Sequence, residues 1–380
     1  MRVLQFGRFW NNQHGGIERH VALLSRELAV QGGLDVVNLV AAGGLHGSDT
    51  SLDGYRLVQA PSLGRVFGTA IAPSLVLKAI ALHREKKFDI LHLHLPDPLS
   101  HFASLMLPAS IKRVITWHSD IVRQKAWLPL YLPFLQHLVS QADAIIAATQ
   151  AHYTSSTQIP QALPANRRHV IAYGLDFRTL ALNSNTRSLC AKIKAKAVGR
   201  PLVFALGRHV YYKGFDVLIN AMRQVDALLV LGGDGQLRAE LEALAGQDEL
   251  AGKIWFSGRI SEENLSAYFH ACDIFCLPSV EQSEAFGLVQ LEAMACGKPV
   301  VCTQLNNGVN IVNIDGQTGL AVPVRDAGAL AGTINRLIAD RPLRERLGLQ
   351  AQQRAITEYS LEAMAQQHLA LYQDLLSTDR

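Results

Sequence analysis

The chain has 380 residues, of which 49% are hydrophobic and 18% charged, a composition that allows large buried cores and excludes a disordered protein. At roughly 150 residues per domain, this length predicts two domains. Five cysteines without a CxxC pair exclude a disulfide scaffold and a cysteine-bound zinc. Residues 1–172 carry 16 Lys and Arg against 10 Asp and Glu, and residues 173–380 carry 20 against 22, so the first half favours an anionic partner unless the difference is ordinary scatter.

Short β-branched runs alternate with amphipathic stretches along the chain. Helices are expected at 17–29 and 74–84 in the first half, between buried strands at 3–6, 35–40, 55–58, 89–94, 113–117 and 144–148. The second half repeats the alternation, with strands expected at 202–206, 227–232, 253–258, 273–278 and 299–303. Strand–helix–strand alternation predicts parallel sheets covered by helices on both faces, and two such series predict two doubly wound domains.

The boundary between the domains is expected near residues 172–200, because a polar, lysine-rich stretch follows the last strand of the first half. A final helix over residues 361–376 gathers its apolar residues on one face. That face predicts packing on another element, and either domain could receive it.

A Gly-Gly pair lies in HGGIERH (14–20), between the first expected strand and the first expected helix. Gly15 and Gly16 would let backbone amides approach a ligand, and the positive end of the following helix favours an anion. The segment is not GxGxxG, so it does not indicate a nicotinamide cofactor. A plain turn is the alternative.

The segment GRHVYYKG (207–214) follows a strand, at the kind of loop where parallel sheets bind ligands. Arg208 offers a fork of donors and Lys213 a point charge, and together they suit a diphosphate. In isolation the same residues also fit a solvated basic turn.

Two glutamates, Glu284 and Glu292, are separated by seven residues within 279–301. A helix is expected over 287–296, so Glu284 precedes it and Glu292 lies one to two turns in. One carboxylate can then reach a sugar while the other reaches a ribose, and the amides near 286–288 face a phosphate. Two surface glutamates are the alternative, against which the Gly and Pro context argues.

His118 lies at the end of an expected strand, in TWHSDIVRQK (116–125). At this place it would contact the substrate; the alternative is a core histidine whose ring nitrogens are hydrogen-bonded within the protein. His92 and His94 alternate on a strand, and no third ligand is expected near them, so the segment is interpreted as a buried strand end and not as a metal site. Arg123 and Lys125 precede WLPLYLPFLQHL (127–138), whose aromatic and apolar residues suit a membrane interface or ordinary packing.

Taken together, GGIE (15–18), WHSD (117–120), GRHVYYKG, the glutamate pair and GQTGLAVP (316–323) resemble the retaining glycosyltransferases of family 4 over nearly the whole chain. The resemblance implies an α/β protein with the GT-B fold, in which two Rossmann-like, doubly wound domains face each other across a cleft. It assigns the acceptor to residues 1–172 and a nucleotide-sugar to residues 173–360. Residues 361–380 become a crossover helix that packs back on the N-terminal domain.

The resemblance also implies roles for residues. Arg208 and Lys213 would hold the departing diphosphate, Glu284 the sugar hydroxyls and Glu292 the ribose, while His118 orients the transition state. The expected catalytic residues are therefore His118, Glu284, Arg208 and Lys213, and the expected donor-binding residues are Gly15, Gly16, Arg208, Lys213, Arg259, Phe286, Gly287, Leu288 and Glu292. Neither a metal nor a cofactor is expected, because the nucleotide-sugar is the substrate.

The first candidate reaction is transfer of mannose from GDP-mannose to a lipid-linked or polysaccharide acceptor in bacterial surface-polysaccharide synthesis, including lipopolysaccharide. A UDP-glucose or other UDP-sugar transferase, a GT-B epimerase and a non-catalytic nucleotide-sugar-binding partner are the alternatives. Nucleic acid is not an expected partner. No apolar run reaches about 18 residues and the start lacks a signal-peptide core, so we expect a cytoplasmic enzyme held peripherally on the inner, anionic face of the membrane.

Overall fold

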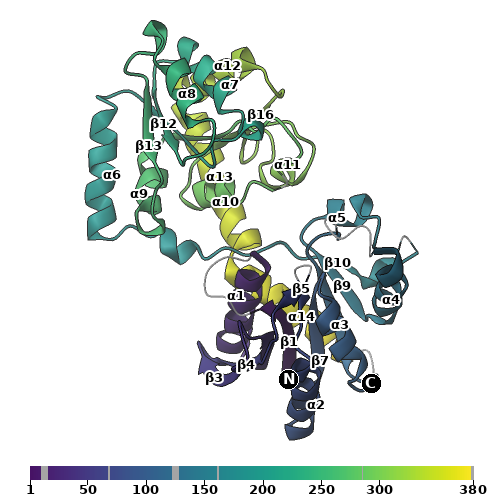
Figure 1. Ribbon diagram of the computed structural model, residues 1–380. Helices are drawn as coiled ribbons and strands as arrows, with labels where there is room; N and C mark the ends of the chain where they lie inside the picture. Colours follow the sequence, from purple (N-terminus) through teal and green to yellow (C-terminus); the bar gives the residue numbers. More distant parts are fainter. Residues whose placement is uncertain (10–15, 67–68, 122–127, 161, 285, 378–380) are drawn as a thin grey trace. The chain divides into compact units, whose positions relative to one another are not determined.

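The computed structural model describes residues 1–9, 16–66, 69–121, 128–160, 162–284 and 286–377. The chain forms two compact units, drawn in Figure 1. Unit 1 comprises Met1–Gly174 together with Leu361–Arg380, and unit 2 comprises Leu175–Ser360.

Backbone contacts place the first boundary after Gly174, at the start of the expected interval 172–200. The Leu175 amide donates to the Tyr359 carbonyl, and Leu175 forms a β-bridge with Ser360, so both residues belong to unit 2. The Gly174 amide instead donates to the Met364 sulfur within unit 1. The boundary between the units therefore lies between Gly174 and Leu175, because their amides donate to residues of different units.

Unit 1 contains an eight-stranded sheet of order β10-β9-β8-β7-β1-β2-β4-β3, in which only β3 and β4 pair antiparallel among the described pairs. Its strands are β1 (Arg2–Phe9), β2 (Asp35–Ala41), β3 (Ser48–Leu52), β4 (Tyr55–Ala60), β7 (Ile90–Leu95), β8 (Lys112–Trp117), β9 (Ala144–Ala147) and β10 (Arg168–Val170). A separate hairpin joins β5 (Arg65–Val66) and β6 (Thr69–Ala70). The helices are α1 (Gly16–Val30), α2 (Ser74–Glu85), α3 (Pro98–Leu105), α4 (Leu128–Gln141), α5 (Gln150–Ser155), η1 (Ala165–Arg167) and α14 (Leu361–Ser377).

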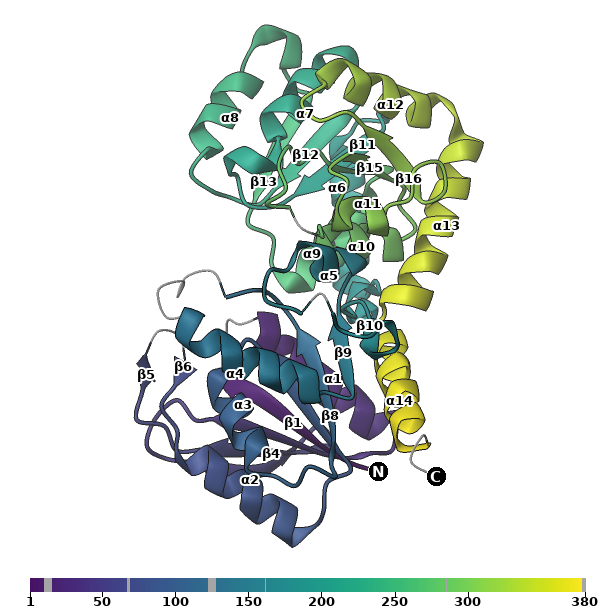
Figure 2. The same ribbon diagram turned by 90° about the vertical axis from the view of Figure 1, so that its right-hand side faces the viewer.

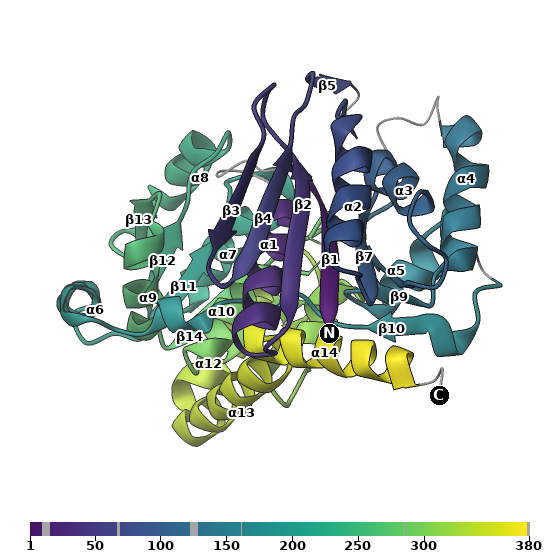
Figure 3. The same cartoon turned by 90° about the horizontal axis from the view of Figure 1, so that it is seen from below.

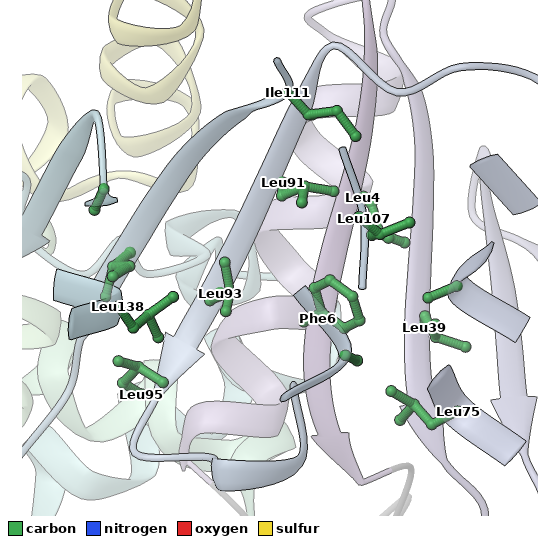
Figure 4. Packing of buried hydrophobic residues seen from close by; sticks show 14 of the residues in the cluster. Leu4, Phe6, Leu39, Leu75, Leu91, Leu93, Leu95, Leu107, Ile111 and Leu138 are labelled. Carbon is green, nitrogen blue, oxygen red and sulfur yellow. The ribbon is translucent and has the colours of Figure 1, made fainter. Parts of the chain in front are cut away.

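Both faces of this sheet are buried. On one face, Phe6 and its strand neighbours pack against Leu75 of α2 and Leu138 of α4 (Figure 4). On the other face, Val3 and its neighbours pack against Leu24 of α1 and Tyr372 of α14. Since successive strand residues point to opposite faces, a strand covered on both sides must be apolar throughout, which explains the near-continuous hydrophobic runs. Helix α14 contacts α1 on its face of the sheet (Figure 3).

Unit 2 contains a six-stranded parallel sheet of order β13-β12-β11-β14-β15-β16. Its strands are β11 (Leu202–Leu206), β12 (Leu228–Gly232), β13 (Ile254–Gly258), β14 (Ile274–Leu277), β15 (Val300–Thr303) and β16 (Gly319–Val322). Its α-helices are α6 (Ser184–Lys196), α7 (Phe215–Ala221), α8 (Arg238–Ala245), α9 (Glu262–Ala271), α10 (Leu288–Ala295), α11 (Gly308–Val312), α12 (Ala327–Ala339) and α13 (Arg341–Tyr359). Short 3₁₀ turns are η2 (Phe177–Leu180), η3 (Tyr211–Lys213), η4 (Met222–Gln224) and η5 (Asp248–Leu250).

The sheet of unit 2 is also covered on both sides. Helices α7, α8 and α12 lie together over one side (Figure 2), where Ile219 and Ile334 pack against Val203 of β11. On the other side, Phe204 of β11 contacts Phe269 of α9, with ring centroids 5.4 Å apart. Chain order reverses between β11 and β14, so the helices that follow these strands leave toward opposite faces.

The expected strands and the expected helices over 17–29, 74–84, 287–296 and 361–376 are present with small shifts of their ends. Strands β3, β5, β6, β10 and β16 were not expected, because each is short and β3 (SDTSL) is polar. The segment 127–138 contributes to α4, which continues through Pro133. Within the ranges that the structure describes, no helix combines the length and the apolar character that crossing a membrane requires.

Candidate functional site

A pocket of about 480 Å³ lies in unit 2, at the loops that follow β11 and β14. The switch in strand order between these two strands is where doubly wound sheets bind ligands, because the loops diverge there and leave a crevice. The residues that line the pocket are Leu206, Gly207, Lys213, Glu284, Phe286, Gly287, Leu288, Val289 and Glu292. The pocket therefore brings together both glutamates of the E-x7-E pair and the lysine of GRHVYYKG.

A buried ion pair forms the polar part of the pocket. Lys213 Nζ lies 2.5 Å from Glu284 Oε2, and both residues are 9% exposed. The same carboxylate oxygen accepts a hydrogen bond from Ser279 Oγ at 2.9 Å. Separating the two side chains would leave an uncompensated charge in a buried position, which is costly. Each side chain therefore holds the other in place.

Two glycines shape the backbone around this pair. Gly214 follows Lys213 with a φ of 64°, and a Cβ there would lie 2.1 Å from the Pro278 carbonyl oxygen. Gly287 precedes α10 with a φ of 63°, and a Cβ there would lie 2.5 Å from Leu277 Cδ2. Any larger residue would be strained at both positions, so the close approach of the two loops depends on glycine.

Helix α10 begins at the pocket, since its N-terminal residues Leu288 and Val289 line it. The first amides of a helix have no intrahelical acceptor and lie at the positive end of the helix dipole. Glu292 lies on the second turn and lines the same pocket. An anion, and in particular a phosphate, fits the start of α10.

Two further predicted residues lie outside the pocket lining. Arg208 is exposed and donates from Nη2 to the Tyr212 hydroxyl at 3.3 Å, on the loop that carries Lys213. Arg259 follows β13 and pairs with Asp234, with Nε to Oδ2 at 3.5 Å. Both sit on loops that leave the carboxyl ends of the strands.

His118 lies in unit 1, directly after β8, and both of its ring nitrogens have partners there. Nδ1 lies 2.9 Å from the Tyr173 hydroxyl, and Nε2 lies 3.1 Å from His94 Nδ1. Burial lowers the pKa of His118 to about 3, so the ring is neutral. Gly16 begins α1, while Gly15, Arg123 and Lys125 lie outside the described residues.

The expectation that His94 has no third ligand nearby is wrong. One ring nitrogen from each of His20, His94 and His118 lies within 4.8 Å of the others. The three residues come from α1, β7 and the end of β8, and they meet only because β7 pairs with β8 and α1 covers the sheet. His92 is not in this group, since its nitrogens contact Tyr372 and Thr116.

Comparison with known proteins shows the family to which the chain belongs. Residues 14–178 match the model for Glycosyltransferase Family 4, and residues 189–354 match that for Glycosyl transferases group 1. O-antigen chain mannosyltransferase C of Escherichia coli is 26% identical over 382 residues, covering 100% of both chains. D-inositol 3-phosphate glycosyltransferase of Xylanimonas cellulosilytica is 31% identical over 291 residues, covering 72% of this chain and 69% of that protein.

Among solved structures, Anabaena Alr3699/HepE in complex with UDP superposes with a TM-score of 0.71 at 22% identity, covering 98% of this chain and 100% of the other. Two doubly wound units of this kind define the GT-B fold. The chain belongs to the glycosyltransferases of group 1 and family 4, and it is a transferase enzyme.

Mild acid is expected to destabilise unit 1. Burial lowers the pKa of several histidines of unit 1 below the usual 6.5, so the folded unit keeps them neutral while the unfolded chain protonates them. They include His20, His92, His94, His118 and His368. The unfolded state then binds more protons, and stability falls as the pH drops below about 6.5, by up to about 1.4 kcal/mol per pH unit for each histidine. Burial raises the pKa of Asp97 to about 6, so this one carboxyl binds a proton more readily in the folded state and offsets part of the loss of stability in acid.

Thermal unfolding between about pH 7.5 and pH 5 measures the effect: the unfolding temperature should change little down to about pH 6.5 and then fall as the pH drops to 5. Replacement of the exposed His137 by Gln should leave the dependence unchanged. An unfolding temperature that stays constant over the same interval would contradict the prediction.

Proposed function

We propose that the protein is a retaining glycosyltransferase that moves a hexose from a nucleotide-sugar to a lipid-linked or polysaccharide acceptor in cell-surface polysaccharide synthesis. The single observation that supports it most is the pocket in which Lys213, Glu284, Glu292 and the start of α10 meet. Mannose from GDP-mannose is the first candidate donor, because the E. coli relative that matches along the whole chain is named an O-antigen chain mannosyltransferase.

The pocket offers a distinct group to each part of such a donor. Lys213 and the first amides of α10 bind the diphosphate, with Arg208 joining from the same loop. Glu284 accepts a hydrogen bond from a sugar hydroxyl through Oε1, since both of its contacts in the structure use Oε2. Glu292, one turn into the helix, accepts hydrogen bonds from the ribose diol.

Departure of the nucleoside diphosphate is the step that these charges assist. As the bond between the anomeric carbon and the phosphate oxygen breaks, negative charge grows on the diphosphate, and Lys213 and Arg208 stabilise it. The acceptor hydroxyl attacks from the face that the diphosphate leaves and passes its proton to the departing phosphate oxygen, so the configuration is retained. His118, whose ring is held by Tyr173 and His94, supports the transition state by its position.

Two alternatives differ from this proposal in observable ways. A UDP-sugar donor is supported by the UDP complex of the Anabaena neighbour, and it changes only the base that is bound. A non-catalytic binding partner would bind the nucleotide-sugar without turnover, and an epimerase would alter the sugar without an acceptor.

A screen of GDP- and UDP-sugars by thermal shift and nucleotide release tests the function. One donor should raise the unfolding temperature and release nucleotide only when a glycan or lipid-linked acceptor is present. A crystal soak should place that nucleotide in unit 2 beside Lys213 and Glu292. Release without acceptor, binding without release, or nucleotide confined to unit 1 would each contradict the proposed reaction.

Replacement of Arg208 or Lys213 by Ala should lower kcat by about 10²–10³, while donor affinity changes less, because the charge matters most in the transition state. Arg208→Lys should also lower kcat, since a point charge cannot reproduce the guanidinium fork. The exposed Arg341→Ala serves as the matched control and should keep wild-type kinetics. Steady-state kinetics and donor dissociation constants of each variant measure the effect. Near-wild-type turnover in both alanine variants would contradict stabilisation of the departing diphosphate by these two charges.

An apolar patch on unit 1 supports attachment to a membrane. Helices α3 and α4 carry no charged residue, and the rings of Phe102 and Phe134 lie 6.3 Å apart between them. Five side chains on and beside these helices are between 40% and 68% exposed: Phe102, Leu105, Met106, Leu130 and Phe134. Apolar and aromatic side chains of this kind insert at the boundary between headgroups and acyl chains.

The double variant Phe102→Ser, Phe134→Ser should therefore lose most of its binding to vesicles of phosphatidylglycerol in a flotation assay. The Leu77→Ser variant should retain it, although Leu77 of α2 is an apolar residue even more exposed than Phe102 or Phe134. Salt should weaken wild-type binding partially, because the basic residues of this unit add an electrostatic attraction to anionic lipid. Equal flotation of the double variant and the wild type would exclude this patch as the membrane contact.

A further inference from the structure

The histidine group of unit 1 has a geometry that hydrogen bonding alone leaves incomplete. His94 Nδ1 and His118 Nε2 are 3.1 Å apart, and the nearby His20 Nε2 is buried without a hydrogen-bond partner among the described residues. The ring centroids of His20 and His118 lie 5.2 Å apart. A buried nitrogen without a partner is costly, so its retention beside two other imidazole nitrogens calls for a ligand.

Neighbouring side chains set which nitrogen of each ring carries a proton. His94 Nε2 lies 2.8 Å from Gln5 Oε1, an acceptor, so the proton is on Nε2 and the lone pair is on Nδ1. The Tyr173 hydroxyl beside His118 Nδ1 can donate or accept. When it accepts, the proton of His118 is on Nδ1, and the lone pair of Nε2 lies beside that of His94.

In that tautomer two lone pairs are close together, and they need a cation between them. The 3.1 Å separation is near the distance of about 3.3 Å between two nitrogens that bind one tetrahedral zinc ion at 2.0–2.1 Å. Gln5 and Tyr173 then occupy the outer positions that orient imidazole ligands in metal sites.

We propose that His20, His94 and His118 bind one divalent zinc ion, through His20 Nε2, His94 Nδ1 and His118 Nε2. A water molecule completes four-coordinate geometry, since three protein ligands leave one position open. His20 and His118 are only partly buried, so an ion can reach the site from solvent, while His94 anchors it from the sheet. No proton is released on binding, because His118 only moves its proton from Nε2 to Nδ1.

The site shares His118 with the transfer reaction proposed above, but that reaction requires no metal. It lies at the reversal of strand order in unit 1, between β1 and β7, where a doubly wound sheet places ligands. Metal binding is measured on the protein without a nucleotide-sugar. Failure of this proposal therefore leaves the proposed function untouched, and failure of the proposed function leaves the metal site untouched.

The test is a titration of the full-length, chelator-stripped protein with Co²⁺, followed by displacement with Zn²⁺. We expect one Co²⁺ per chain with visible d–d absorption that Zn²⁺ abolishes. His20→Ala should weaken binding at least about tenfold, and Tyr173→Phe, which removes only the outer hydroxyl, should weaken it by about 10–100-fold. Circular dichroism and thermal unfolding without metal show whether each variant is folded, and the isosteric Tyr173→Phe keeps the test valid if His20→Ala unfolds.

His101→Ala is the matched control, since His101 is a buried histidine of the same unit whose Nε2 also lacks a partner among the described residues. It should bind Co²⁺ with wild-type affinity. X-ray absorption of the Zn²⁺ form should show three imidazole nitrogens. The proposal is overturned if Co²⁺ does not bind stoichiometrically. It is also overturned if a folded His20→Ala or Tyr173→Phe variant binds Co²⁺ as tightly as the wild type, because the metal would then be bound by other histidines.

Discussion

The parallel direction of neighbouring strands determines where chemistry can occur in both units. When β11 and β14 run side by side in the same direction, their carboxyl ends meet at one edge, and the loops that follow them must diverge. The same holds for β1 and β7 in unit 1. Lys213 and Glu284 stand at the first of these edges, and the histidine group stands at the second.

The two edges hold buried polar groups in different ways. In unit 2 the Lys213 ammonium and the Glu284 carboxylate compensate each other, and Ser279 takes part of the remaining hydrogen-bonding capacity. In unit 1 the groups stay neutral, because an imidazole has one donor and one acceptor and can form a chain of bonds without net charge. The first arrangement is an ion pair without net charge, and the second is a set of neutral rings that keep nitrogen lone pairs.

Prediction from the sequence succeeded where the information is local. Strands such as 202–206 are apolar over their whole length, and six of the residues named from the sequence motifs line one pocket. Strand β3 was missed because its SDTSL sequence is polar, and its only strand partner among the described pairs is β4. The histidine group was missed because 24 residues separate His94 from His118, and a paired sheet has to bring them together.

The path of the chain between the units has a consequence for synthesis. Leu175 and Ser360 form a β-bridge, so unit 2 begins and ends at adjacent residues and is an insertion within unit 1. The buried residues of α14, including Met364 and Tyr372, complete one face of the unit 1 core, yet they are translated after the whole of unit 2. On the ribosome, unit 2 can therefore close its own core first, while unit 1 waits for α14.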